Sequence, residues 1–219
     1  LDREQVMTLD GTVNKSLLSI AMTMLAAWWT WIHPEMISLV LPALLVSVIV
    51  VIALMFKKHW APALTPVYAI AEGVMLGMIS LWANTKYPGI AFQAVSLTFG
   101  VFAALLFAYK SRVIKATENF KLGVVAATGG IAIMYLCVMV ANLFGYPTPF
   151  MHSSSPLSIG ISVVVVIVAA LNLVLDFDFI ETASNSGDAP KYMEWYAAFG
   201  LLVTLVWLYV EILHLLMKL

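Results

Sequence analysis

Long apolar runs, separated by short polar or Pro/Gly-rich breaks, dominate the pattern of this chain. Each run approaches the roughly 20 apolar residues that a helix needs to cross a hydrocarbon layer about 30 Å thick. The run Val163 to Val168 is continuously hydrophobic, whereas strands of a transmembrane barrel alternate polar and apolar residues. The pattern predicts an all-α integral membrane protein, a bundle of seven transmembrane helices. The expected spans lie near residues 16–32, 36–56, 62–82, 91–109, 122–143, 157–180 and 192–216.

Lys and Arg predict the orientation of the helices, because cytoplasmic loops of membrane proteins are enriched in them. With seven spans, nine of the 11 basic residues fall on the side of the N-terminus. We therefore predict a cytoplasmic N-terminal arm, residues 1–15, followed by a single seven-helix domain, residues 16–219. The arm lacks the basic start, apolar core and cleavage site of a signal peptide, so the first membrane helix is expected to direct insertion.

The composition supports this class and excludes other functions. Of the 219 residues, 63% are hydrophobic and 11% are charged, whereas about a quarter of a soluble domain is charged. The net charge is −1 and the basic residues are scattered, which excludes a face that binds nucleic-acid phosphates. Cys137 is the only cysteine, so no disulfide within the chain and no site of several cysteines can form.

Residue patterns of familiar membrane enzymes and receptors are absent from the sequence. No lysine lies mid-span for a retinal Schiff base, no Gly-x-Ser-x-Gly run occurs, and no pair of histidines is placed to bind haem. We therefore expect a non-enzymatic protein with no metal ligands and no cofactor. Its main partner is then the lipid bilayer.

Four acidic residues lie inside the predicted spans, where a charge is costly and usually marks function: Glu72, Asp176, Asp178 and Glu211. No mid-span Lys or Arg neutralises them, so each must bind a proton, meet water or share a cation. Glu72 lies near the centre of its span and is followed by Gly73 and Gly77, a spacing that lets another helix approach closely. The alternative for Glu72 is a protonated carboxyl with a structural hydrogen bond.

Two polar stripes accompany these acids. Asn172 precedes Asp176 by four residues, on the same helical face, and so supports an orientation into the bundle. Asp178 lies about 200° further round the helix, so the two aspartates cannot both face one site, and solvation at the interface is the alternative for Asp178. On the last helix, Glu211 and His214 belong to a second stripe, where a hydrogen-bonded pair at the helix end is favoured over a metal site.

Several of these segments resemble a known family. Residues 169–180, Ala-Ala-Leu-Asn-Leu-Val-Leu-Asp-Phe-Asp-Phe-Ile, resemble the sixth helix of the Bax inhibitor-1 family, which ends with an aspartate. Residues 207–213, Trp-Leu-Tyr-Val-Glu-Ile-Leu, look like the family's Leu-Tyr-Leu-Asp run with Glu in place of Asp. Residues 66–73, 122–130 and 189–195 resemble a bacterial branch of the family.

The resemblance implies a seven-helix protein of the bacterial inner membrane. In it, one acid from helix 6 and one from helix 7 share a proton and gate a pH-dependent calcium leak. Asp176 matches the helix 6 acid, with Asp178 a close competitor, and Glu211 matches the helix 7 acid by its local pattern.

Helix geometry disagrees with that pairing of acids. At 1.5 Å per residue from the inner ends of the predicted spans, Asp176 lies about 6 Å deep and Glu211 about 28 Å deep, so their carboxyls are not expected to touch. The residue of the last helix at the level of Asp176 would be Tyr196. The second carboxyl could instead be Asp178, Glu194 or Glu72.

The leading hypothesis is a pH-sensitive ion leak, with calcium as the permeant ion, gated by the buried carboxylates. The rival hypothesis is a regulatory or scaffold protein that acts on other membrane proteins, such as a quality-control protease, with structural acids. Ion flux through the purified protein separates the two.

Overall fold

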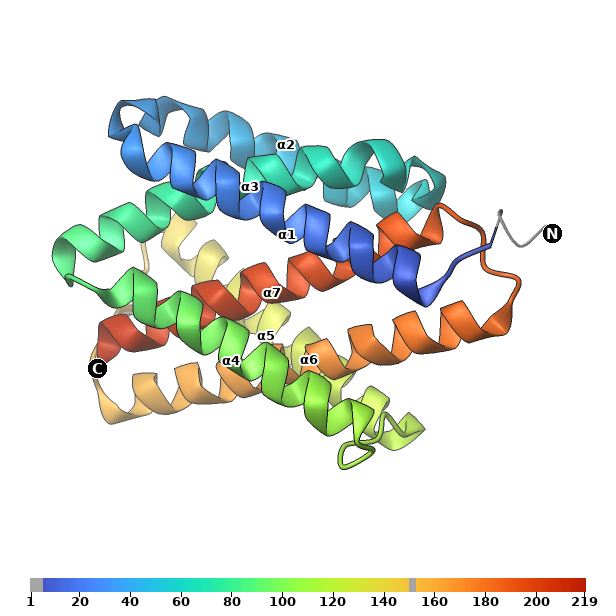
Figure 1. Cartoon of the computed structure of the whole chain (residues 1–219). Helices are drawn as coiled ribbons and strands as arrows, with labels where there is room; N and C mark the ends of the chain where they lie inside the picture. The colour runs from blue at the N-terminus through green and yellow to red at the C-terminus, as the bar shows by residue number, and fades with distance from the viewer. Residues whose placement is uncertain (1–5, 150–152) are drawn as a thin grey trace. The chain divides into compact units, whose positions relative to one another are not determined.

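The computed structural model describes residues 6–149 and 153–219, and helices account for most of them (Figure 1). Within these residues, extended backbone pairs at one isolated antiparallel bridge, between Val6 and Pro190. The segments are α1 (Leu9–Ile32), η2 (Pro34–Leu39), α2 (Val40–Phe56), η3 (Lys58–Trp60), α3 (Ala61–Lys86), α4 (Ile90–Lys110), α5 (Glu118–Leu143), α6 (Pro156–Ser186) and α7 (Met193–Lys218).

Six stretches of the described chain are helical, long and apolar enough to cross a membrane: Pro34–Phe56, Lys58–Lys86, Ile90–Lys110, Glu118–Leu143, Pro156–Ser186 and Met193–Lys218. Helix α1 is not among them, because Asp10, Asn14 and Lys15 occupy its first turns and its apolar part begins only at Ser16. The predicted all-helical membrane fold is confirmed. The seventh span and the cytoplasmic N-terminus remain predictions.

Several helices extend beyond the predicted spans. The apolar run of α6 predicts an end at Ile180, but the helix continues to Ser186, and α3 continues past Trp82 to Lys86. Polar residues such as Glu181 are compatible with a helix outside lipid. An apolar run therefore marks where a helix meets the edge of the hydrocarbon, and the helix itself can continue further.

The chain divides into two compact units, each described here by itself. Unit 1 contains Leu1–Ala91 and Asp176–Val206, and unit 2 contains Phe92–Leu175 and Trp207–Leu219. Helices α6 and α7 are each divided between the two units. Unit 1 is therefore discontinuous in sequence.

In unit 1, α1 packs closely along α3 (Figure 1). Two glycines make this approach possible: a Cβ on Gly73 would lie 2.4 Å from the Thr23 carbonyl oxygen, and a Cβ on Gly77 would lie 2.4 Å from that of Ala27. The close helix contact predicted beside Glu72 is present, and α1 is the partner. The apolar core of this unit comes from α2, α3 and α7, with Val50, Leu54, Ala61, Tyr68, Ala69, Phe199 and Leu202 buried.

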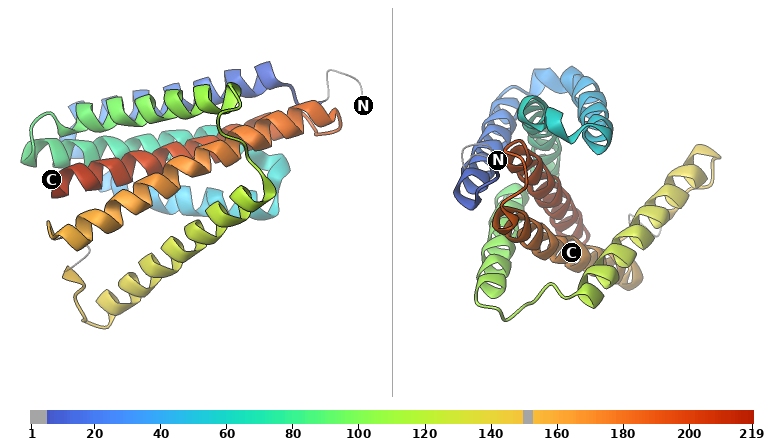
Figure 2. Two further views of the ribbon diagram at one scale, coloured as in Figure 1. Left: turned by 90° about the horizontal axis from the view of Figure 1, so that it is seen from below. Right: turned by 90° about the vertical axis from the view of Figure 1, so that its right-hand side faces the viewer.

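In unit 2, a connection of seven residues, 111–117, separates α4 from α5, and Figure 2 shows it running between the two helices. Thr117 caps α5 by accepting a hydrogen bond from the Phe120 amide at 3.2 Å. Most side chains of α5 are exposed, and Val124 is a buried exception. An apolar helix with so little protein around it is suited to contact lipid.

Candidate functional site

Asp176 meets helix α7 at Gly200 and Thr204. A Cβ on Gly200 would lie 3.8 Å from Oδ1 of Asp176, so the absence of a side chain there leaves room for the carboxyl. The Thr204 hydroxyl interacts with the carboxyl and also donates to the Gly200 carbonyl at 3.1 Å. Oδ2 of Asp176 is buried and has no hydrogen-bond partner among the described residues. In the part of the chain that the structure describes, Oδ2 is therefore a buried acceptor without a donor.

The sequence predicts that Tyr196 is the residue of α7 at the level of Asp176, and this prediction was wrong. The structure places Gly200 and Thr204 beside Asp176, whereas Tyr196 packs against Phe179, with ring centroids 6.4 Å apart. The predicted depth of Asp176 takes Ile180 as the inner end of its helix, but α6 continues to Ser186. The six additional residues move Asp176 about 9 Å further from the inner end of its helix.

Asn172 has partners on α5 and on its own helix. Its side-chain amide donates to the Thr128 hydroxyl at 2.8 Å and to the Val168 carbonyl at 2.9 Å. Because these bonds use the donors of the amide, they fix Asn172 within unit 2, to which Asp176 does not belong. Its predicted support of Asp176 stays a prediction.

Glu72 is buried in unit 1, at 7% exposure. The Tyr68 hydroxyl, one turn earlier on α3, and the Ser47 hydroxyl of α2 lie near its carboxyl. Glu72 thus resembles Asp176: it is a buried acid with a hydroxyl neighbour.

Asp178 is half-buried and takes part in an interaction of its own. It lies two residues after Asp176, about 200° round α6, so the expectation that these aspartates face different directions is unchanged.

Glu211 belongs to unit 2 and is 5% exposed. Its Oε1 accepts a hydrogen bond from the Tyr135 hydroxyl of α5 at 2.6 Å and one from the Trp207 indole at 3.3 Å. Oε2 is buried and lacks a hydrogen-bond partner in the described part of the chain. Tyr135 does not stand out in the sequence, although it follows Thr128 by almost two helical turns on the same face of α5.

Glu194, at the start of α7, is fully buried and has more polar partners than the other acids. It accepts from the Thr8 amide at 2.9 Å and the Thr8 hydroxyl at 2.8 Å. It also forms ion pairs with Lys15 and with Lys191, the latter at 2.9 Å. A Cβ on Gly11 would lie 2.3 Å from Oε1 of Glu194, so the carboxylate needs a glycine at that position.

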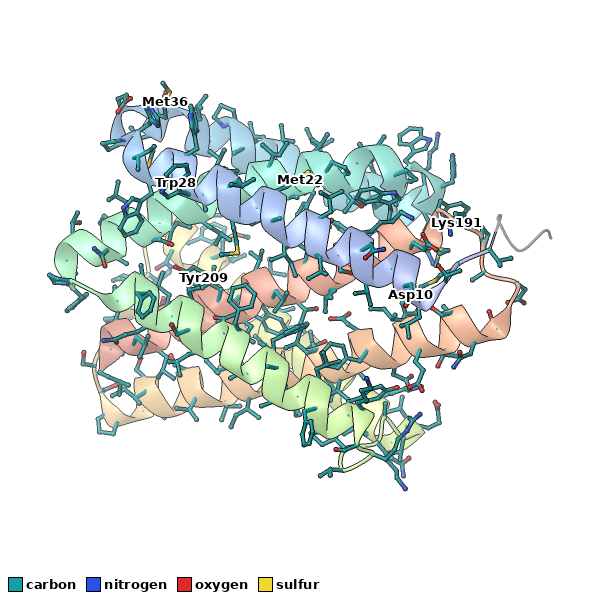
Figure 3. All side chains as sticks on the ribbon, viewed as in Figure 1. Asp10, Met22, Trp28, Met36, Lys191 and Tyr209 are labelled. Carbon is teal, nitrogen blue, oxygen red and sulfur yellow. The ribbon has the colours of Figure 1, made fainter. Side chains whose placement is uncertain are left out.

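The surroundings of Glu194 join the N-terminal arm to the connection between α6 and α7. The Met7 amide donates to the Ala189 carbonyl at 2.8 Å, and the Met7 side chain is buried against Ile180 and Ala197. Figure 3 shows Asp10 and Lys191 at this end of unit 1. This network is not apparent from the sequence, because a polar arm and an acid at a helix start are both ordinary features of a solvated surface.

The described residues contain no group of three or more His, Cys, Asp or Glu side chains that could hold a metal ion. What unites Asp176, Glu72 and Glu211 is a buried carboxyl beside a hydroxyl group. Such carboxyls can bind and release a proton or transiently share a cation.

A comparison with protein-family models matches residues 2–219 to the family described as Bax inhibitor 1 like. The match covers the whole chain apart from its first residue and agrees with the resemblance found in the sequence. A search of the curated proteins finds no match to this chain.

Proposed function

Because the chain belongs to the Bax inhibitor 1 like family, we propose that it is a non-enzymatic, pH-sensitive cation leak of the bacterial inner membrane. Buried carboxylates gate it, and Asp176 is the principal one. The observation that carries this proposal is the buried Oδ2 of Asp176, which has no donor among the described residues. Asp178, Glu72 and Glu211 are the further proton-sensing candidates.

The environment of Asp176 supports a change of state on protonation. An ionised carboxylate needs hydrogen-bond donors or a cation in an apolar interior, whereas a protonated one does not. Thr204 has one hydroxyl hydrogen, and Gly200 and Asp176 both offer it an acceptor. Ionised Asp176 competes for that hydrogen more strongly than protonated Asp176. Protonation can therefore change the contact between α6 and α7 at this level.

Calcium suits the proposal as the permeant ion. Calcium prefers oxygen ligands, and ionised carboxylates are its usual partners in proteins. In this role calcium is cargo, and no resident metal site is required. The proposed topology has α1 as a seventh span, with the N-terminus in the cytoplasm, because that count gathers the basic residues on one side.

The test is calcium flux into proteoliposomes at several pH values, with wild type and Asp176→Asn compared. Asn mimics the protonated acid, so the variant should show the wild-type flux of the acidic limit at every pH. Asp188→Asn is the matched control, because Asp188 is exposed in the connection between α6 and α7. If folded Asp176→Asn keeps the wild-type pH profile, Asp176 is not the sensor. Absence of flux at every pH in the wild type would favour the scaffold hypothesis instead.

A further inference from the structure

A short segment, residues 6–8, precedes α1 and is called here the strap. Val6 pairs with Pro190 in an antiparallel bridge, and the Met7 amide donates to the Ala189 carbonyl at 2.8 Å. Ala189 and Pro190 belong to the connection between α6 and α7. Figure 1 shows the start of α1 beside this connection. The strap therefore binds the connection through its backbone, and all of these residues belong to unit 1.

The Met7 side chain of the strap packs against both helices that the connection joins. Met7 is 2% exposed and shares one apolar cluster with Ile180 of α6 and Ala197 of α7. Ile180 follows Asp176 by four residues. Ala197 precedes Gly200, the α7 neighbour of Asp176, by three residues. At 1.5 Å per residue, Met7 therefore joins α6 to α7 about 5 Å along the helices from the site at Asp176.

Glu194 anchors the strap, but it does not depend on the strap alone for its partners. Its Oε1 accepts hydrogen bonds from the Thr8 amide and the Thr8 hydroxyl, at 2.9 and 2.8 Å. Lys15 and Lys191 form ion pairs with the same carboxylate, and neither lies in the strap. A buried charge is costly when it is left uncompensated. With both ammonium groups in place, Glu194 stays paired when the strap detaches, so the strap can leave and return.

Helix α1 is held by contacts of its own, further along its length. Thr23 and Ala27 approach α3 closely at Gly73 and Gly77. These contacts begin roughly four helical turns beyond the strap. A short segment at a chain end, with one buried apolar side chain, is a typical place for local opening. The strap can therefore detach while α1 stays packed on α3.

We infer that the strap is an autoinhibitory closure of the cation leak. In the bound state, Met7 ties α6 to α7 and keeps this end of the helix pair closed. When the strap detaches, the two helices lose that common contact and can separate, so water and a cation reach Asp176 from this end. The inference rests on the proposed function for the flux that the strap limits. Detachment of the strap itself can be measured without flux.

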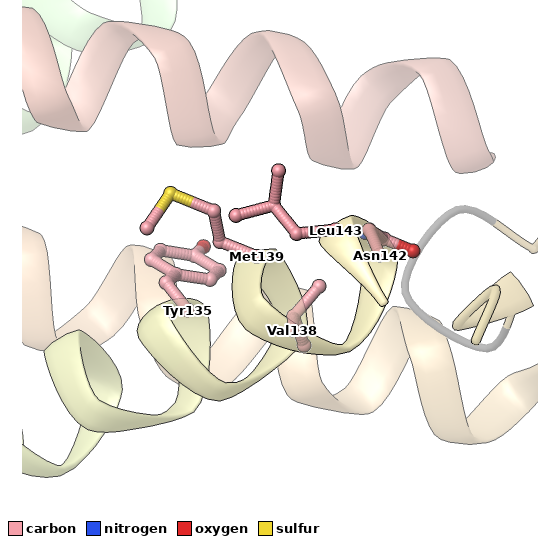
Figure 4. A pocket seen from close by; sticks show the side chains of 5 residues that line it. All are labelled: Tyr135, Val138, Met139, Asn142 and Leu143. Atoms are coloured by element: carbon pink, nitrogen blue, oxygen red, sulfur yellow. The ribbon is translucent and has the colours of Figure 1, made fainter. Parts of the chain in front are cut away.

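The first experiment is Met7→Ala, which removes the apolar contact and keeps the backbone bonds of the strap. We expect calcium flux into proteoliposomes to rise about tenfold or more at every pH, because truncating a buried methionine shifts an equilibrium by at least that factor. The matched control is Met139→Ala, with the wild-type flux. Met139 is exposed on α5, where it lines an open, mostly apolar hollow of about 450 Å³ (Figure 4). The other residues that line the hollow are Tyr135, Val138, Asn142 and Leu143.

A disulfide that fixes the strap tests the opposite direction. The bond from Met7 to Ala189 flanks the pair Val6 and Pro190, which is therefore a pair without hydrogen bonds of its own. The Cα atoms of such a pair lie about 4.5 Å apart, a separation that a disulfide can span. Val6→Cys/Pro190→Cys, combined with Cys137→Ser, should lose most of its flux on oxidation and regain it on reduction. Cys137→Ser alone should respond to neither treatment. If the oxidised protein keeps the flux of its reduced form, the inference is overturned.

Hydrogen exchange measures detachment without flux. The amides of Met7 and Thr8, both donors in the bound strap, should exchange faster than those of residues 23–30 in α1. Oxidation of the engineered cysteine pair should slow them by about tenfold or more. A strap that exchanges no faster than α1 would also overturn the inference, while pH-dependent flux in the same protein would still support the proposal for Asp176. Fast exchange of the strap without flux at any pH would instead contradict the proposed function.

Discussion

Replacing Gly77 by alanine adds one methyl group at a close contact between α1 and α3. The new Cβ would lie 1.9 Å from the Thr30 hydroxyl oxygen and 2.4 Å from the Ala27 carbonyl oxygen. Thr30 can move its side chain away at the cost of its bonds to Ala26 and Ala27, at 3.0 and 3.1 Å. The Ala27 carbonyl belongs to the helix backbone, so relieving that contact requires α1 to move.

Two opposing effects determine the magnitude. Alanine is favoured over glycine in a helix by up to about 1 kcal/mol. Overpacking of a tight contact costs about 1–3 kcal/mol, and a contact with backbone belongs at the upper end of that range. We therefore expect Gly77→Ala to lower the free energy of unfolding by about 1–2 kcal/mol.

Gly100 on α4 provides the matched control, because nothing lies within 4 Å of a Cβ built there. Gly100→Ala should be neutral or stabilising by up to about 1 kcal/mol. The assay is equilibrium unfolding of both variants in detergent micelles. Adding Thr30→Ala to Gly77→Ala should restore only part of the stability, because the Ala27 contact remains. If Gly77→Ala proves as stable as Gly100→Ala, then α1 does not pack on α3 as described.

Three further predictions concern separate parts of the chain. Glu194→Gln should lower the free energy of unfolding by about 3–5 kcal/mol, because it leaves buried donors and Lys15 without the carboxylate. The control is Glu118→Gln, at an exposed position. Equal stability of the two variants would contradict the network around Glu194. A reporter fused after Leu219 should read as non-cytoplasmic, and a cytoplasmic signal would contradict the seven-span topology. Glu72→Gln should alter pH-dependent flux or proton uptake in a folded protein, and wild-type behaviour in both assays would return Glu72 to a structural role.

The sequence predicts the helices well because each apolar run must satisfy its backbone hydrogen bonds internally in lipid. It also singles out Asp176 and Glu72 as acids within the apolar spans, since a charged residue in such a run is conspicuous. The close approach of a helix beside Glu72 is also predictable, because Gly73 and Gly77 have a spacing that serves little other purpose.

Partners on other helices cannot be predicted in the same way. The level of Asp176 on α7 depends on where α6 ends, and the apolar run does not mark that end. Glu194 has the appearance of a solvated helix-start acid, and its burial depends on Thr8, 186 positions earlier in the chain. Only the folded chain brings these residues together.

The link between Thr8, Lys15 and Glu194 has a consequence for the timing of biogenesis. A ribosome makes Glu194 long after the arm and α1 have emerged, and the sequence of unit 2 is mostly synthesised in between. Contacts between residues so distant in sequence form late and slowly. Until Glu194 is synthesised, Lys15 and the Thr8 amide must therefore be solvated by water or lie at the lipid surface. A ribosome-stalled chain that ends before α7 should expose the arm to protease, and one that extends beyond Glu194 should protect it.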